Sequence, residues 1–330
     1  MTAPREVVRR ILADRTDQPK GTAKVYVPAN IALVKYWGKR DEALNLPVTG
    51  SLSVSLGPLG SHVELSRAAG PADEIRLNGA HLPADGSFAK RASAYLDLFR
   101  PRDFFFAVQA RNTVPTAAGF ASSASGFAAL AKAADALFGW GLAPRELSIL
   151  ARLGSGSAAR SLADGFVEWH AGQAADGMDS YAERVAAEWP ELRVGALVLC
   201  AEEKPVGSRA GMKRCVETCE FYREWPARVA RDLAELKAAI ARKDFAALGA
   251  IAEGNALAMH ALMAATRPPL LYALPETVAA MRTIWAVRAT GLPLWFTMDA
   301  GPNVKLLFEA KDEARVREMF PGIDVVAPFG

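Results

Sequence analysis

Hydrophobic and polar residues alternate in several short stretches of the first part of the chain, a period typical of half-buried strands. In residues 51–56, Leu52, Val54 and Leu56 alternate with serines. Asn78-Gly79 is a pair that favours a two-residue hairpin turn. The pattern predicts strands at 23–27, 51–56, 62–66, 74–77 and 104–110, and helices at 2–14 and 88–99.

From residue 123 onward the apolar spacing changes to a helical period, first in an Ala-rich stretch that ends at Gly139. We read Trp189-Pro190 as the interruption of a helix and place a domain boundary near residue 190. Helices are predicted at 123–138, 144–153, 211–222, 226–241, 245–264, 275–290 and 311–319, and strands at 194–200, 294–298 and 304–309. This mixture predicts the α+β class, with an N-terminal extension at 1–22 and domains at 23–190 and 191–330.

Composition narrows the function classes. The 330 residues include 39 Lys and Arg against 36 Asp and Glu, a net charge of +3 that favours no nucleic-acid partner. We find no apolar run of the roughly 18 residues that span a bilayer, and no secretory signal at the N-terminus, so we expect no membrane partner. The three cysteines, Cys200, Cys215 and Cys219, are expected to be reduced thiols in a cytoplasmic protein, since a metal or disulfide site is rare in such a setting.

The segment Pro115-Thr-Ala-Ala-Gly-Phe-Ala-Ser-Ser-Ala-Ser125 precedes and opens the helix predicted at 123. Small residues let a backbone approach an anion, and a helix N-terminus offers unpaired N–H groups and a partial positive charge. The residues that would contact a phosphate here are Pro115, Ala118, Gly119, Ala121, Ser122, Ser123 and Ala124, and the two serines are also candidate Mg²⁺ ligands. A tight turn capped by serine explains the same residues equally well.

Two further segments carry cations among aromatic or small residues. In Asn30-Ile-Ala-Leu-Val-Lys-Tyr-Trp-Gly-Lys39, the two lysines suit phosphate and the aromatic pair could exclude water, although a solvated basic stretch with two core aromatics is the simpler explanation. In Gly154-Ser-Gly-Ser-Ala-Ala-Arg-Ser161, Arg160 presents a planar fork that matches a carboxylate or phosphate. A Gly/Ser loop with a surface arginine is the alternative there.

Asp299 ends a predicted strand in Phe296-Thr-Met-Asp-Ala-Gly-Pro-Asn303. Such a residue commonly bonds to its own turn. A second short segment, Ser208-Arg-Ala-Gly-Met212, is a weaker motif, and an ordinary surface position explains Arg209 as well as a binding role does.

These segments, in this order, resemble the diphosphomevalonate decarboxylases of the GHMP kinase superfamily. The likeness runs from Lys24 to about Val326 and omits the first twenty or so residues. It departs from the family at Phe120, usually Leu, and at Asp164, usually Gly, which we expect to face away from the site. The stretch that begins at Gly50-Ser51 also varies from the family.

The resemblance implies a two-domain fold, with a ribosomal-protein-S5-like N-terminal domain and a ferredoxin-like C-terminal domain. It implies ATP and Mg²⁺ as cofactors, mevalonate 5-diphosphate as the small-molecule substrate, and a homodimer. Asp299 would be the catalytic base, Arg160 would meet the substrate carboxylate, and Lys35 and Ser208 would act beside them. The substrate-binding residues implied are Tyr36, Trp37, Lys39, Ser155, Gly156, Ser157, Arg160, Arg209 and Met212.

Other activities stay open on sequence grounds. A phosphomevalonate decarboxylase or a mevalonate kinase of the same superfamily is one alternative, although Lys35, Lys39, Ser157, Arg160 and Arg209 together favour the diphosphate substrate. A non-catalytic binding module is another. The N-terminal extension is expected to be a dimer contact or a loosely packed cap.

Overall fold

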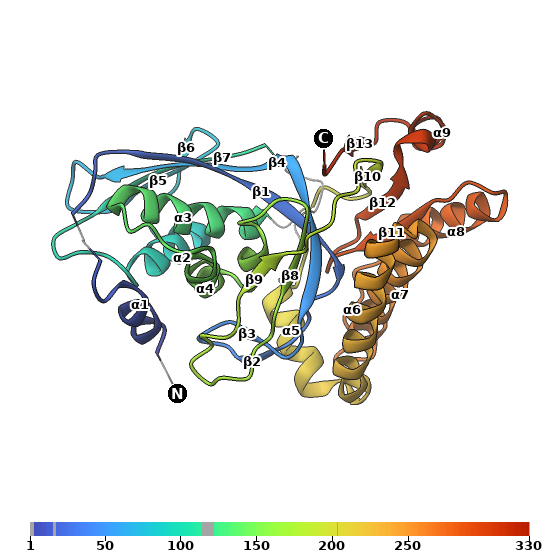
Figure 1. The fold of residues 1–330 in the computed structure, drawn as a ribbon, viewed down its shortest axis with the longest axis horizontal. Coiled ribbons are helices and arrows are strands. Elements are labelled where there is room, and N and C mark those ends of the chain that lie inside the picture. The colour runs from blue at the N-terminus through green and yellow to red at the C-terminus, as the bar shows by residue number, and fades with distance from the viewer. Residues whose placement is uncertain (1–2, 16–17, 114–121, 203, 330) are drawn as a thin grey trace.

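The computed structural model describes residues 3–15, 18–113, 122–202 and 204–329. One sheet with the first four helices forms the left half of the molecule in Figure 1, and a second, smaller sheet with helices α6 to α9 forms the right half. The first sheet contains β1 (Ala23–Val34), β4 (Ser51–Arg67), β5 (Glu74–Leu77), β6 (Ala80–His81), β7 (Phe106–Asn112), β8 (Phe166–Trp169) and β9 (Ala182–Arg184).

The 17-residue strand β4 is central to this sheet, whose order is β6-β5-β7-β4-β8-β9. Its C-terminal part pairs with β7, its N-terminal part pairs with β8, and β1 lies antiparallel along most of its length. Leu52, Val54 and Leu56 face one side and join a hydrophobic core, as their alternation predicts. Ser51 and Ser53 therefore lie on the opposite side of the strand, where both are buried.

Three helices and a 3-10 turn pack with this sheet: α2 (Ser87–Leu96), α3 (Ser122–Phe138), α4 (Pro144–Gly154) and η1 (Gly156–Arg160). Helix α3 contacts β1 and β4, because its Ala-rich faces let the helix approach the sheet closely. A two-stranded sheet of β2 (Lys39–Asp41) and β3 (Leu46–Pro47) lies between β1 and β4 in sequence.

The N-terminal segment is part of the first core, which corrects the expectation of a loosely packed cap, while the alternative of a dimer contact stays a prediction. Helix α1 (Pro4–Leu12) buries Val7, Val8 and Ile11 in the same cluster as α2, α3 and α4. Arg15, just after it, pairs with Glu146 of α4 at 3.0 Å. The segment is thus held by apolar burial and by an ion pair.

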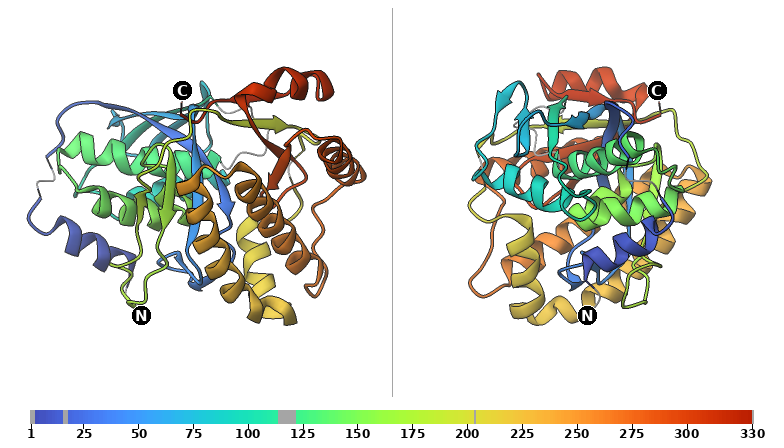
Figure 2. Two further views of the ribbon diagram at one scale, coloured as in Figure 1. Left: turned by 45° about the vertical axis from the view of Figure 1, so that its right-hand side comes forward. Right: turned by 90° about the vertical axis from the view of Figure 1, so that its left-hand side faces the viewer.

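The second sheet has the order β11-β12-β10-β13 and is antiparallel throughout. Figure 2 shows its helices, α6 to α9, gathered on one side of the molecule. The elements are β10 (Leu192–Leu197), α5 (Ser208–Thr218), η2 (Glu220–Glu224), α6 (Trp225–Arg242), α7 (Phe245–Ala264), α8 (Pro275–Ala289), β11 (Trp295–Met298), β12 (Val304–Glu309), η3 (Ala310–Asp312), α9 (Glu313–Met319) and β13 (Asp324–Val326).

Helix α7 joins the two halves. It contacts α6, β11 and also β1 of the first sheet. One core cluster includes Ile31 and Leu33 of β1 together with Leu248, Ala252 and Met259 of α7. Gly249 permits this packing, since a Cβ there would lie 2.1 Å from the Trp295 ring. The ends of β1 and β11 consequently meet at the junction of the two halves.

By length and composition α7 is also apolar enough to cross a membrane, which the sequence analysis did not notice. Half of its most apolar window is buried within the protein, as in the core helix of a soluble domain. The expectation that no membrane is involved stays a prediction.

Most predicted elements are present with small shifts at their ends, and α7, β5 and β12 have the predicted bounds. The predicted interruption of a helix at Trp189-Pro190 is wrong, because these residues lie in the irregular connection between β9 and β10. The sequence analysis missed the short strands β2, β3, β6, β8, β9 and β13. It made β1 too short and divided β4 into two strands, at 51–56 and 62–66.

Candidate active site

At the junction of the two halves, Lys35, which follows β1, lies beside Asp299, which follows β11. Lys35 Nζ lies 3.0 Å from Asp299 Oδ1 and donates a second hydrogen bond, of 2.7 Å, to the carbonyl oxygen of Ala32. The Lys35 side chain is 2% exposed, whereas that of Asp299 is 30% exposed. The carboxylate is therefore reachable from outside while the ammonium lies behind it.

Three lysines surround Asp299, and two of them, Lys204 and Lys305, were missed by sequence reasoning. Burial alone would raise the pKa of Asp299, but the charges of Lys35, Lys305 and Lys204 outweigh it and hold the pKa below its ordinary value. The carboxylate is thus ionised at neutral pH. Burial lowers the pKa of Lys305 to about 8, an effect that Asp299 opposes and that Lys35 and Lys204 reinforce.

Lys204 connects the Asp299 turn to the start of α5. Its ammonium donates to Ser208 Oγ at 2.8 Å and to the carbonyl oxygen of Ala300 at 2.6 Å. Ser208, a predicted catalytic residue, is thereby placed beside the Asp299 turn. Neither Lys204 nor Lys305 stands in a recognisable motif with its neighbours, so only the fold reveals that they gather there.

Arg160, in η1, contributes a further buried cation. Its side chain donates to Ser51 Oγ at 2.6 Å through Nη1, while its buried Nε has no hydrogen-bond partner among the described residues. Burial lowers the pKa of Arg160 to about 10, with Asp299 opposing the shift, so the guanidinium stays charged at neutral pH. The unpaired Nε is a donor that a bound anion would satisfy.

Tyr36 lies over the loop that leads into η1. Its hydroxyl is buried without a partner among the described residues, and its ring meets that of Trp169 at 4.8 Å. Burial raises the pKa of this hydroxyl, and the charge of Glu42 adds to the rise. Gly156 is required beneath it, because a Cβ there would lie 2.9 Å from Tyr36 Oη. Ser155 and Ser157, on either side of Gly156, are half-buried.

A second group of cations involves Lys39, Arg209 and Arg91. The Lys39 ammonium pairs with Glu42 at 2.7 Å, and burial lowers its pKa against the pull of that partner. The charges of Arg209 and of Arg91 on α2 lower it further, which places the three cations near one another. Arg209 donates to the carbonyl oxygen of Gly154 at 3.3 Å, beside the Ser155–Ser157 loop. Arg91 is another residue that the sequence analysis missed.

Two predicted substrate-binding residues lie in the core. Trp37 is 3% exposed and Met212 is 7% exposed, and both belong to the cluster shared by the two halves. Trp37 accepts a 2.8 Å hydrogen bond from Tyr222 through its carbonyl oxygen. Both side chains thus pack in the core beneath the site, and their predicted contact with substrate stays a prediction. Asp164, expected to face away, is exposed beside Tyr26.

The predicted phosphate loop is described only at its end. Pro115, Ala118, Gly119 and Ala121, and the side chain of Ser122, lie outside the described residues. Ser123 and Ala124 stand in the first turn of α3, half-buried and buried respectively. Ser61 of β4 ties this turn to β7, since its hydroxyl bonds to Ser125 Oγ and to Asn112 Oδ1, each at 2.8 Å.

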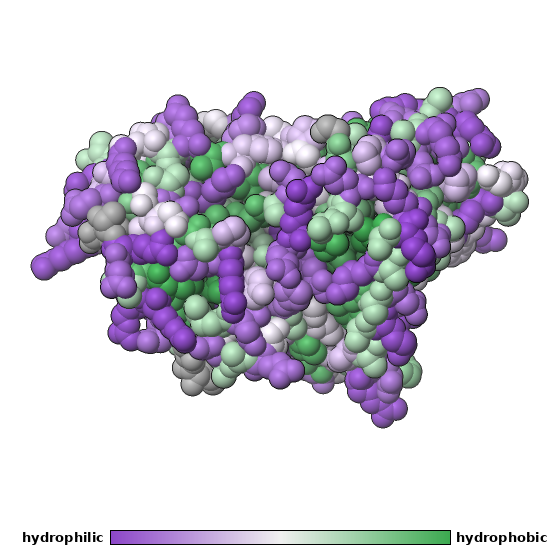
Figure 3. Space-filling view, viewed as in Figure 1, coloured by the Kyte–Doolittle hydropathy of each residue, from purple (hydrophilic) through white to green (hydrophobic). Residues whose placement is uncertain are grey.

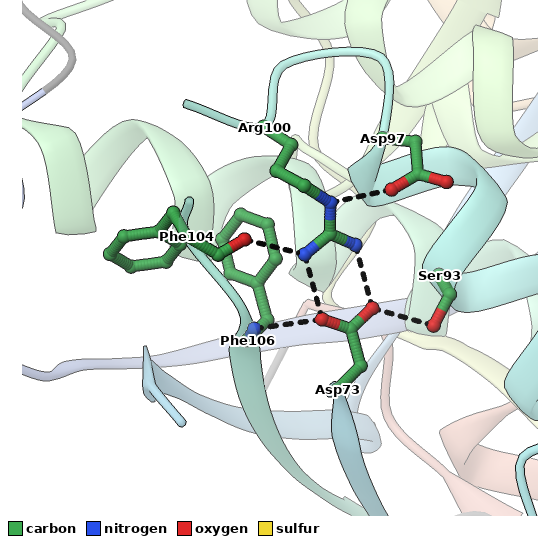
Figure 4. Close-up of polar contacts among 6 residues, drawn as sticks. All are labelled: Asp73, Ser93, Asp97, Arg100, Phe104 and Phe106. Carbon is green, nitrogen blue, oxygen red and sulfur yellow. Dashed lines mark hydrogen bonds and ion pairs between the residues drawn. The ribbon is translucent and has the colours of Figure 1, made fainter. Parts of the chain in front are cut away.

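Two cavities lie away from these residues. One, of about 580 Å³, lies over β1, β4, β5 and β7. The other, of about 470 Å³, adjoins a polar network that Figure 4 shows. There Arg100 makes a two-point ion pair with Asp73 at 2.7 and 2.8 Å and donates to Asp97 at 2.5 Å. Because these charges satisfy one another, we read the network as structural.

Comparison with known proteins identifies the arrangement. A family model of the diphosphomevalonate decarboxylase-like N-terminal domain matches residues 27–182, and one of the mevalonate 5-diphosphate decarboxylase C-terminal domain matches residues 194–323. Diphosphomevalonate decarboxylase of Aspergillus fumigatus is 39% identical over 325 residues, which cover 91% of this chain and 80% of that protein. The chain belongs to the diphosphomevalonate decarboxylase family.

Solved structures of the family share its fold. The mevalonate diphosphate decarboxylase of Staphylococcus aureus superposes with a TM-score of 0.87 at 38% identity, covering 93% of this chain and 95% of that one. A structure described as MDDEF in complex with MVAPP, AMPPCP and magnesium has a TM-score of 0.85 at 39% identity, covering 94% and 98%. The predicted two-domain GHMP kinase fold is confirmed.

Proposed function

We propose that this protein catalyses the ATP-dependent decarboxylation of mevalonate 5-diphosphate to isopentenyl diphosphate, with release of ADP, phosphate and CO₂. The observation that carries the proposal is the Lys35–Asp299 pair in a family member, a reachable carboxylate kept ionised by buried lysines. The predicted roles of Asp299, Lys35, Arg160 and Ser208 rest on this geometry and on the resemblance.

The first chemical step needs a base. The C3 hydroxyl of the substrate is tertiary and unactivated, so a carboxylate within hydrogen-bond reach must orient it and accept its proton as its oxygen bonds to the γ-phosphorus of ATP. Asp299 is the half-buried carboxylate placed for this, and Lys35 fixes its orientation. The bond from γ-phosphorus to ADP breaks in the same step.

In the second step, phosphate leaves C3 with the bonding electrons, and the C1–C2 bond breaks to release CO₂ and form the C2=C3 double bond. The leaving phosphate gains negative charge, which nearby cations stabilise. Lys35, Lys204 and Lys305 are such cations around Asp299. Arg160, whose Nε has no partner among the residues that the structure describes, is the candidate partner of the substrate carboxylate until CO₂ departs.

A nucleotide with Mg²⁺ fits the residues present. Mg²⁺ takes few ligands from protein and the rest from phosphate and water. In line with this, the described residues contain no group of three His, Cys, Asp or Glu placed to hold a metal by themselves. The Ser123 hydroxyl, in the first turn of α3, is an oxygen donor of the right kind. When bound, the ion would offset the charge of the nucleotide phosphates.

Incubation with ATP, Mg²⁺ and either mevalonate 5-phosphate or mevalonate 5-diphosphate tests the proposal, with CO₂, ADP and phosphate assayed together. We expect equal amounts of all three from the diphosphate and little from the monophosphate, because Lys39, Arg209 and Arg91 form a cation group suited to a second phosphate. Turnover of the monophosphate alone would assign the protein to the alternative decarboxylase. Formation of ADP without CO₂ would make it a kinase.

We also propose a cytoplasmic homodimer. All three cysteines are free thiols, as a reducing compartment requires. Several large apolar side chains are exposed, among them Phe221 at 66% and Leu271 at 72%. Figure 3 shows apolar areas between polar side chains on the face in view. Light scattering on the purified protein distinguishes a monomer from a dimer.

A further inference from the structure

Helix α7 carries two polar side chains that bind the main chain of the site pair. Asn255 Oδ1 accepts a hydrogen bond from the backbone N–H of Lys35 at 2.8 Å. His260 Nε2 lies 2.9 Å from the backbone carbonyl oxygen of Asp299. Both contacts are to backbone atoms, so they leave the Lys35 ammonium and the Asp299 carboxylate available for chemistry.

The orientation of the Asn255 amide is fixed by its other partner. Its Nδ2 donates to Asp232 Oδ2 at 2.7 Å, and Asp232 is in turn paired with Arg228 Nε at 2.9 and 3.0 Å. A carboxylate only accepts hydrogen bonds, so the amide nitrogen must face Asp232 and the amide oxygen must face Lys35. Asn255 is 0% exposed and Asp232 is 6% exposed, which protects both bonds from water.

His260 acts as a neutral donor. A carbonyl oxygen only accepts, so the proton of the His260 imidazole is on Nε2. Burial lowers the pKa of His260 to about 4, although the bond to Asp299 opposes the shift. The histidine is therefore neutral wherever the enzyme works, and it holds the Asp299 turn in the same way across that range.

These contacts matter because no strand pairing joins Lys35 to Asp299. Lys35 follows β1 of the first sheet and Asp299 follows β11 of the second. Helix α7 packs on both strands and carries a polar contact to each of the two residues. A catalytic group misplaced by about 1 Å can lower turnover by roughly 10²-fold. Because Asn255 and His260 lie on one helix, their contacts hold Lys35 and Asp299 at a fixed separation and so prevent such a displacement.

We propose that Asn255 and His260 are positioning residues that set the separation of the Lys35 ammonium and the Asp299 carboxylate across the junction. The inference rests on the proposed function. Neither residue touches substrate in this account, so removing either contact should lower kcat more than it changes KM.

The kinetic test uses His260→Leu, His260→Gln and Asn255→Leu, with Met259→Leu as the matched control. Met259 is buried on the same helix and belongs to the apolar cluster shared by the two halves. We expect His260→Leu and Asn255→Leu to lower kcat by about tenfold or more while KM changes by less than about threefold. Glutamine keeps an N–H donor, so the kcat of His260→Gln should be within about threefold of wild type. The kcat of Met259→Leu should also be within about threefold of wild type.

Two kinetic results would overturn the proposal. The first is folded His260→Leu and Asn255→Leu proteins whose kcat stays within about twofold of wild type. The second is a folded His260→Gln enzyme as inactive as His260→Leu, with one limb of the kcat pH profile missing, because that would make His260 an acid–base group.

A measurement that needs no turnover separates this inference from the proposed function. In protein labelled with ¹⁵N-lysine, hydrogen exchange of the Lys35 amide should be slow in wild type and in Met259→Leu, and faster by about tenfold or more in Asn255→Leu. If that variant does not fold, Asp232→Asn serves instead, since it weakens the hydrogen bond that orients the Asn255 amide. Unchanged exchange at Lys35 in the folded variant would refute the role of Asn255 whatever substrate the enzyme uses.

Discussion

Lys35 Nζ and Asp299 Oδ1 lie 3.0 Å apart, although 264 residues separate them along the chain. Helix α7 packs on both β1 and β11, and the pair lies where the ends of these two strands meet. With Lys204 and Lys305, Lys35 holds the pKa of Asp299 below its ordinary value against the effect of burial. The chemistry of the site is thus a property of the junction between the two halves.

Asp299→Asn tests the base. An amide has the shape of the carboxylate but cannot accept the C3 hydroxyl proton, so turnover should fall by roughly 10²- to 10⁴-fold. Nucleotide affinity and melting temperature should change little by comparison. Steady-state kinetics with nucleotide titration measure both, and more than about a tenth of wild-type turnover would remove Asp299 from this role.

The lowered pKa of Lys305 predicts that activity falls at alkaline pH. Its pKa is lowered to about 8, so its charge is lost as pH rises through that value, and the site then attracts anionic substrates less strongly. The KM for ATP should therefore rise above about pH 8 in wild type. In Lys305→Met it should be higher at neutral pH and flat across the same range. Identical pH profiles for the two proteins would contradict the assignment.

Arg160→Lys keeps a charge but loses the planar fork. Because Nη1 is bonded to Ser51 Oγ and Nε has no partner within the described part of the chain, the guanidinium is both anchored and available. We expect at least about a tenfold loss of kcat/KM for the diphosphate, equivalent to roughly 1.4 kcal/mol. Ser51→Ala, which removes only the anchor, should lose less. Wild-type kinetics in the lysine variant would show that the fork is not used.

The N-terminal helix should affect stability and not chemistry. Val8 is 3% exposed in the core of the first half, so Val8→Asp should lower the melting temperature by several degrees, the scale of roughly 1–2 kcal/mol or more. Arg5→Asp, an exposed change on the same helix, should not. Deletion of residues 1–19 should destabilise the protein similarly while leaving turnover within about twofold at a permissive temperature. A stable but inactive deletion would place the segment at the active site.

The local pattern of apolar and polar residues predicted the elements whose conformation depends mainly on their own residues. The bounds of α7, β5 and β12 were predicted because uninterrupted apolar spacing defines them. Strand β3 has two residues and is too short to show a period, and the four residues of β8, Phe166–Trp169, do not alternate; both depend on pairing with other strands. The prediction at Trp189-Pro190 was wrong because a proline is as common within a loop as at the end of a helix.

The site residues likewise fall into those that the local sequence predicts and those that it does not. Lys35, Arg160 and Asp299 stand in dense motifs, so the sequence alone points to them. Lys204, Lys305, Arg91, Asn255 and His260 are single polar residues in ordinary helix, strand or loop context. Their positions depend on contacts between residues far apart in the chain, which no local pattern encodes. Conversely, Trp37 and Met212 belong to motifs but pack in the core.

The most direct test follows carbon from the substrate. Mevalonate 5-diphosphate labelled at C1 is incubated with ATP and Mg²⁺, and labelled CO₂, ADP and isopentenyl diphosphate are measured for wild type and Asp299→Asn. The account predicts one CO₂ and one ADP for each isopentenyl diphosphate from wild type, and roughly a hundredth or less of that rate from the variant. Wild-type protein that binds ATP but releases no labelled CO₂, or a variant as fast as wild type, would contradict it.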